Sequence, residues 1–112
     1  MYSIYVDDER DPKGKFDIIC RTTNDAVKAV RRKYKEGVRH FYLDLDHDAG
    51  LDSLTGEHGG DFINVLKQID AYVNMGRMRD LDIEVSYHTG NPVGRENMHN
   101  FVTHTGYMRE LL

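Results

Sequence analysis

Carboxylate and imidazole side chains directly follow three apolar, β-rich stretches of this 112-residue chain. These side chains are Asp7 and Asp8, Asp46 and His47, and His88. Carboxylates crowded together repel one another, and burying an unpaired one is costly. A divalent cation converts that repulsion into coordination, so these residue types predict a metal-centred site.

The acidic residues differ from the histidines in the metals they favour. Asp7, Asp8 and Asp46 would form an oxygen-rich set of ligands suited to Mg²⁺ or Mn²⁺, which is the predicted cofactor. Adding the imidazole of His47 or His88 would shift the preference toward Mn²⁺, Fe²⁺ or Zn²⁺. Asp44, two positions before Asp46, is interpreted as an auxiliary or structural carboxylate.

Groups suited to binding a phosphate follow His88 along the chain. Thr89 offers a hydroxyl, and Asn91 can cap a helix whose first residue is Pro92. The first N–H groups of a helix form an anion site. Arg95, one turn into this helix, can pair with a phosphate through two hydrogen bonds. We therefore predict that Thr89, Asn91 and Arg95 position a phosphate.

Hydrophobic periodicity predicts the elements that must position these residues. Alternating or continuous apolar patterns predict strands, and apolar residues three and four apart predict helices. Residues 2–6, 16–20, 38–45 and 81–87 are the expected strands. The expected helices run from a cap at Thr22 to a stop at Gly37, from a cap at Asp61 to about residue 74, and onward from Pro92. After residue 101 the pattern fits a strand, a helix end, or both.

Strands that alternate with amphipathic helices predict an α/β fold with a parallel sheet covered on both faces. Ligands of such sheets bind beyond the carboxyl ends of the strands. The acidic and histidine-containing segments all follow the carboxyl ends of predicted strands. We therefore expect them to meet at one edge of the sheet.

Length and composition predict one domain spanning residues 1–112 in the cytoplasm. No apolar run is long enough to span a membrane, no signal peptide is visible, and the single cysteine, Cys20, fits a reducing compartment. The net charge of −4 argues against nucleic-acid binding through overall charge but leaves a local basic patch open. The basic run 31–35 is interpreted as the solvated face of its helix rather than as an RNA-binding patch.

The strand-end residues resemble the receiver domain of two-component signalling. Asp7 with Asp8 matches the acidic pair after strand one, Asp46 the phosphoryl-accepting aspartate of strand three, and Thr89 the hydroxyl residue after strand four. This resemblance implies Mg²⁺ binding and phosphorylation of Asp46. Three features depart from it. Only about ten residues separate the first two strands, no lysine follows position 100, and histidines stand at His47 and His88.

A divergent branch, the cyclic-phosphate processing receiver-like domains, is similar in more places. The matching segments are VDDER at 6–10, LDHDAG at 45–50 and HTGNPVGRENM at 88–98, and the likeness spans roughly residues 2–100. It implies a small receiver-like, flavodoxin-like three-layer sandwich with a mostly parallel sheet and a first helix that is reduced or absent. It also implies metal-assisted handling of cyclic phosphates on nucleotides or RNA ends. The segment EHGG at 57–60 is an insertion relative to the pattern.

Our leading hypothesis is a divalent-metal-dependent phosphoester hydrolase. Asp7, Asp8 and Asp46 would hold the metal, and His47 or His88 would act as general base or acid. The expected partner is a phosphorylated small molecule or an RNA terminus. One alternative is a phospho-accepting signalling module without hydrolase chemistry. Another is a catalytically inert interaction domain, with the oligomeric state, a dimer included, left open.

Overall fold

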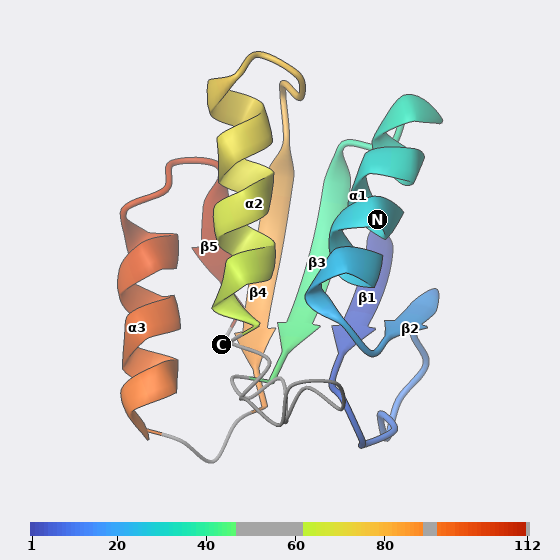
Figure 1. The fold of residues 1–112 in the computed structure, drawn as a ribbon, viewed down its shortest axis with the longest axis vertical. Coiled ribbons are helices and arrows are strands. Elements are labelled where there is room, and N and C mark those ends of the chain that lie inside the picture. Colours follow the sequence, from blue (N-terminus) through green and yellow to red (C-terminus); the bar gives the residue numbers. More distant parts are fainter. Residues whose placement is uncertain (47–61, 89–91, 112) are drawn as a thin grey trace, which may run out of the picture.

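A computed structural model describes residues 1–46, 62–88 and 92–111 as a five-stranded, all-parallel sheet with three helices. The strand order is β2-β1-β3-β4-β5 (Figure 1). The elements in chain order are β1 (Tyr2–Val6), β2 (Ile18–Cys20), α1 (Thr23–Lys35), β3 (His40–Leu45), α2 (Ile63–Asn74), β4 (Asp82–Tyr87), α3 (Pro92–Thr103) and β5 (Met108–Glu110). The predicted receiver-like α/β fold with a parallel sheet is confirmed.

The helices gather on one side of the sheet because of its topology. The connections from β2 to β3, from β3 to β4 and from β4 to β5 all cross the sheet in the same direction. Crossovers between parallel strands are right-handed, so crossovers in one direction put their helices on one side. Figure 1 shows α1 and α2 in front of the strands, with α3 flanking β5.

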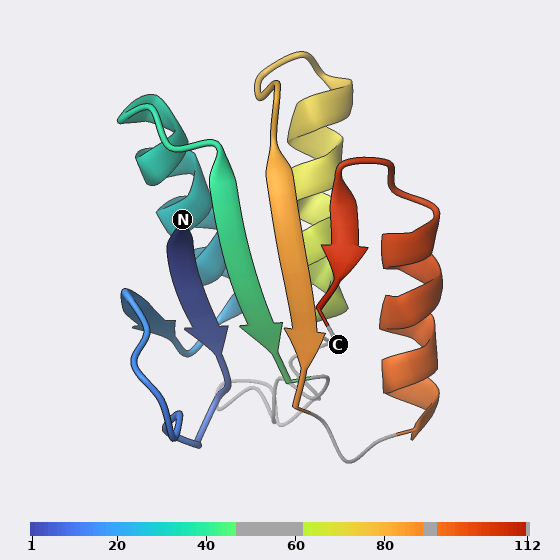
Figure 2. The ribbon, with the colours of Figure 1, turned by 180° about the vertical axis from the view of Figure 1, so that it is seen from behind.

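The opposite face of the sheet carries no helix in the described part of the chain. Only the connection from β1 to β2 runs the other way, and residues 7–17 contain no helix. The expected loss of the first helix is therefore confirmed. Seen from behind, β1, β3 and β4 face the viewer directly (Figure 2). Within the described residues the helices cover one face of the sheet, so the second helical layer of a three-layer sandwich is not seen in this part of the chain.

Side chains alternate between the two faces as this arrangement requires. On the helix side, the strands contribute completely buried apolar residues, which are Ile4, Val6, Phe41, Leu43, Leu45, Ile83 and Val85. On the helix-free side, the same strands carry half-buried polar residues, among them Tyr42, Asp44, Glu84 and Ser86. The main hydrophobic core therefore lies between the sheet and its helices.

Helix boundaries follow local chemistry. The Thr22 side chain accepts a hydrogen bond from the Asp25 N–H at 3.1 Å, which confirms the predicted cap of α1. Gly37, with φ of 102°, ends that helix in a left-handed conformation. Pro92 begins α3 as predicted. The predicted cap Asp61 lies outside the described residues. None of the helices in the described ranges is long and apolar enough to cross a bilayer.

The C-terminal segment contains both a helix end and a strand. α3 ends at Thr103, and the chain returns to add β5 in parallel to β4. Buried residues four apart on α3, Gly94, Met98 and Val102, face the core. The sequence left this choice open because the strand has only three residues.

We predict that Cys20 resists alkylation in the native protein. The thiol is 2% exposed, and burial, with a smaller contribution from the charge of Asp25, raises its pKa to about 11. A thiol alkylates as its thiolate, so this shift should slow labelling at pH 8 about 100-fold beyond the steric protection. The measurement is the rate of iodoacetamide labelling with and without urea. Equal rates in the two conditions would contradict the buried position of Cys20.

Candidate metal centre

Asp7 is a buried carboxylate at the carboxyl end of β1. Its N–H donates to the Cys20 carbonyl at 3.1 Å, which continues the pairing of β1 with β2. Its Oδ1 accepts the backbone N–H groups of Glu9 and Arg10, each at 2.9 Å. Aspartate commonly holds the turn that follows it in this way. The turn occupies Oδ1 and directs Oδ2 toward the end of β4.

His88, at the carboxyl end of β4, contacts Asp7 Oδ2. Its Nε2 lies 2.9 Å from Asp7 Oδ2, and its Nδ1 lies 2.7 Å from Asp44 Oδ1. The ring also stacks on Tyr5, with 4.6 Å between centroids and 10° between planes. Both ring nitrogens and one ring face are thus engaged, so the position of the imidazole is tightly defined.

Asp46 completes the cluster from the end of β3. Its N–H donates to the Val6 carbonyl at 3.0 Å, which holds the residue beside Asp7. Asp7, Asp46 and His88 each offer an oxygen or nitrogen atom, and these atoms all lie within 4.8 Å of one another. Among the described residues, this is the one group of three or more acidic, histidine or cysteine side chains with that geometry.

Asp8 does not belong to this group, although the sequence predicted it as a ligand. It lies in the turn that Asp7 Oδ1 organises, and it is half-buried. Asp7 and Asp46 are brought together as expected, while His88 takes the third position. A single ion could therefore bind two carboxylates and one imidazole, a mixed set that suits Mn²⁺, Fe²⁺ or Zn²⁺ better than Mg²⁺.

The charges of the cluster shift two pKa values in opposite directions. Burial alone would raise the pKa of Asp7, but the N–H groups of Arg10 and Glu9, and then His88, outweigh it and lower that pKa. Burial alone would lower the pKa of His88, but hydrogen bonds and negative charge from Asp44 and then Asp7 outweigh it and raise that pKa. The two carboxylates therefore favour the protonated form of His88, whose two ring nitrogens face Asp44 and Asp7.

Asp44 has a more specific place than the sequence indicated. Its carboxylate is half-buried and accepts the hydrogen bond from His88 Nδ1. Metal-bound histidines typically donate their other ring N–H to a carboxylate, which fixes the tautomer and raises ligand basicity. Asp44, His88 and a metal at Nε2 would form this arrangement. The alternation of Asp44 and Asp46 along β3 was the one sequence signal for it.

The other predicted residues have different outcomes. Arg95, in the first turn of α3, donates from Nη2 to the Tyr87 carbonyl at 3.2 Å, beside His88. Its guanidinium is exposed, which leaves it accessible at the end of β4. His47, Thr89 and Asn91 lie outside the described residues, so their predicted roles stay predictions.

A cleft of about 370 Å³ opens next to the cluster on the helix-free face. Asp44, His88 and Tyr5 form one wall, and the connection between β1 and β2 forms the other. That connection contributes Arg10, Asp11, Pro12, Lys13, Gly14 and Phe16. The missing first helix leaves this approach open. Sequence reasoning did not include this cleft, because its walls come from three separate segments.

The charges on the rim of the cleft favour an anion. Asp11 pairs with Arg21, and Asp44 is engaged by His88, so both carboxylates are balanced. Within the described residues, Arg10 and Lys13 form no ion pair, and both are exposed. The cleft therefore combines two cations that have no ion pair among the described residues with a candidate metal centre, which fits a phosphate-containing ligand.

Comparison with known proteins gives one match. A family model described as the cyclic-phosphate processing receiver domain matches residues 2–104. The matched range includes every residue of the cluster and the cleft beside it. No curated protein and no solved structure matches the chain.

Proposed function

Since this chain belongs to the cyclic-phosphate processing receiver domains, we propose that it is a divalent-metal-dependent phosphoesterase that opens a cyclic phosphate. The observation that supports this proposal is the meeting of Asp7, Asp46 and His88 within 4.8 Å. Three strand ends contribute to it, and a plain structural role would not require an imidazole between two carboxylates. The proposed substrate is a cyclic phosphate on a nucleotide or an RNA end.

Three residues of the cluster would bind the metal, and Asp44 would orient one of them. Asp7 Oδ2, a carboxylate oxygen of Asp46 and His88 Nε2 would be the ligands. Asp44 would keep the remaining proton on His88 Nδ1 and so expose a free Nε2 to the metal. When bound, the metal polarises the phosphoryl oxygens and lowers the pKa of a water molecule. This proposal gives His88 the role of ligand in place of general acid or base.

Substrate would approach through the cleft on the helix-free face. Arg10 and Lys13 on its rim, and Arg95 at the end of β4, would neutralise the phosphate. Water adds to phosphorus, one of the two ring P–O ester bonds breaks, and the released sugar hydroxyl takes up a proton. The attacking water gives up a proton in the same reaction, and His47 stays our predicted general base or acid for these transfers, because it directly follows Asp46.

The phospho-accepting alternative lacks a cation in the expected place. Receiver domains carry a lysine at the end of strand five, whereas β5 here is Met108–Glu110. Its single cation, Arg109, pairs with Asp82 and Glu84 on the helix-free face. This arrangement weighs against phosphorylation of Asp46 as the main activity.

Metal binding should be visible as stabilisation of the folded protein. A metal present at about 100 times its dissociation constant stabilises the fold by about 2.7 kcal/mol, which should raise Tm by roughly 10 °C in a domain of this size. We expect this rise with Mn²⁺ and its reversal by EDTA. The same preparation should hydrolyse a 2′,3′-cyclic nucleotide only while Mn²⁺ or Mg²⁺ is present.

Two results would count against the proposal separately. An unchanged Tm in the presence of Mn²⁺, Mg²⁺ or Zn²⁺ would rule out the proposed metal centre. A clear rise in Tm without hydrolysis of any cyclic or linear phosphoester would rule out the phosphoesterase activity but leave the metal site standing. Formation of an acid-labile phosphate on Asp46 from acetyl phosphate would instead favour the phospho-accepting module.

A further inference from the structure

Positive charge is concentrated at the end of the molecule opposite the candidate metal centre. Residues 28–39 and 77–80 contain eight of the fifteen Lys and Arg residues but only two of the nineteen Asp and Glu residues. This region therefore carries a formal charge of +6 on a chain whose net charge is −4. It comprises the last turns of α1, the connection that leads to β3 and part of the connection after α2. The net charge of −4 for the whole chain therefore gives no indication of this local positive charge.

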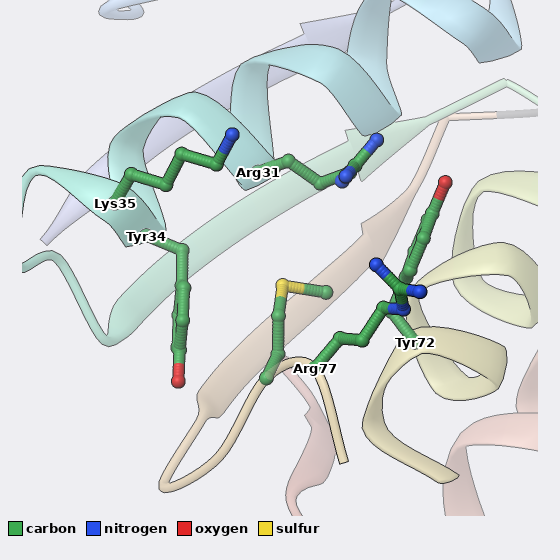
Figure 3. A pocket seen from close by; sticks show the side chains of 6 residues that line it. Arg31, Tyr34, Lys35, Tyr72 and Arg77 are labelled. Atoms are coloured by element: carbon green, nitrogen blue, oxygen red, sulfur yellow. The ribbon is translucent and has the colours of Figure 1, made fainter. Parts of the chain in front are cut away.

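A cleft of about 270 Å³ lies within this basic region, between α1 and the end of α2. Figure 3 shows Arg31, Tyr34 and Lys35 reaching it from α1, while Tyr72 and Arg77 approach from the other side. The Tyr34 hydroxyl accepts the Arg79 backbone N–H at 3.0 Å, which ties the two sides together. The cleft is thus one surface and not two neighbouring patches.

Aromatic rings hold two of the guanidinium groups in place. The Arg31 guanidinium lies 4.4 Å from the centroid of the Tyr72 ring, and that of Arg39 lies 3.8 Å from the Tyr34 ring. Stacking of this kind orients a guanidinium without neutralising its charge. Both arginines are therefore held in place and keep their positive charge, although Arg39 also donates from Nη1 to the Tyr34 and Val38 carbonyls.

The cations of the cleft have no acidic partner in the part of the chain that the structure describes. Lys33 pairs with Glu36, but Arg31, Lys35 and Arg77 form no ion pair there. Several like charges held together without counter-charge repel one another, and an anionic ligand would relieve this repulsion. The local structure therefore favours an anion that spans several cations.

The exposed face of α1 extends the cleft into a stripe. Lys28, Arg32 and Lys35 are exposed and are spaced four and three residues apart, which places them along one side of the helix. The stripe is about 10 Å long at 1.5 Å per residue. We name this stripe and the cleft together the basic ridge. A linear series of cations matches a linear series of phosphates better than it matches a single small anion.

We infer that the basic ridge binds the phosphate backbone of a single-stranded polynucleotide. Arginines predominate in the region, and arginine matches phosphate geometry through two parallel hydrogen bonds. Basic residues interleaved with tyrosines are also typical of surfaces that bind single strands. The ridge includes every residue of the run 31–35 except Lys33, and the sequence alone favoured this run as a solvated helix face.

This site is distinct from the metal centre. Arg39, which packs on Tyr34 of the ridge, precedes β3, and Asp46 follows it, so the length of a six-residue strand, about 20 Å, separates the two ends. Binding at the ridge would hold a strand without requiring hydrolysis at the cluster. The inference therefore stands whether or not the proposed function is correct.

The test is the salt dependence of RNA binding. A fluorescent uridine oligonucleotide of about ten residues is titrated with protein in EDTA, so that no metal contributes. Contacts to four phosphates predict a slope of about −2.8 for log K against log salt, or about 50-fold weaker binding at 200 mM than at 50 mM salt. The double variant Lys35→Gln/Arg77→Gln should reduce this to about sevenfold and weaken binding at least tenfold at low salt.

A matched double variant, Lys15→Gln/Lys67→Gln, removes the same charge from exposed positions outside the ridge. It should leave the affinity within about twofold of the wild type, and thermal unfolding should show that both variants fold. An equal loss in the control would reduce the inference to non-specific charge. Absence of binding at low salt would overturn it, as would equally tight binding of a glutamate decapeptide, which would assign the ridge to an acidic protein.

Discussion

Replacing His88 with alanine is expected to lower Mn²⁺ affinity by about 100-fold or more, and to lower cyclic-phosphate hydrolysis at subsaturating Mn²⁺ by a similar factor. The imidazole is the nitrogen ligand of the candidate centre, and it also separates the carboxylates of Asp7 and Asp44. Removing it withdraws a ligand and leaves two carboxylates facing each other. Isothermal titration with Mn²⁺, together with initial rates on a 2′,3′-cyclic nucleotide, measures both effects.

Comparing metal affinity with the rate of hydrolysis shows whether His88 acts as a metal ligand or as a general acid or base. A ligand loses metal affinity and rate together, whereas a general acid or base loses rate at saturating metal with affinity intact. His88→Gln keeps a hydrogen-bond donor toward the carboxylates and tests the ligand role in a variant with less charge repulsion. His99→Ala removes an exposed imidazole on α3 that pairs with Glu110, and it should behave as wild type. Wild-type metal affinity and rate in both His88 variants would refute the proposed centre.

Replacing Ile83 with alanine is expected to destabilise the fold by about 2–5 kcal/mol. Ile83 lies in β4, is completely buried, and faces the single helix layer. A domain of this size has about 5–15 kcal/mol of stability, so this one change removes a large share of it. Urea unfolding followed by circular dichroism measures the difference.

The matched control is Ile19→Ala in β2. Ile19 is also a strand isoleucine, but it is 43% exposed at the edge of the sheet. Its truncation should cost less than about 1 kcal/mol, because little apolar surface returns to water. Similar losses for both variants would contradict the assignment of the core to one side of the sheet.

Much of the secondary structure could be predicted because it depends on local signals. The Thr22 cap, the Gly37 stop and the Pro92 start are encoded within a few residues, and all three are confirmed. Short edge strands were less predictable. Three residues carry too little periodicity to separate strand from turn, so β2 is shorter than expected and β5 was left open.

The number of helical layers depended on topology and not on local pattern. Amphipathic helices predicted coverage of the sheet, but periodicity does not say which face a helix covers. That choice followed from three crossovers in the same direction and from the helix-free segment 7–17. The same segment opens the cleft beside His88.

The sequence by itself determined that acidic and histidine residues follow three strands and meet at one edge, because parallel strands end on the same side of a sheet. Only the tertiary structure decided which of them meet. The turn after β1 uses one Asp7 oxygen and carries Asp8 out of the cluster, while the other oxygen reaches His88. The register of β3 and β4 places Asp44 against the same ring. Side-chain convergence of this kind depends on turn geometry and strand register, which join residues more than 80 positions apart.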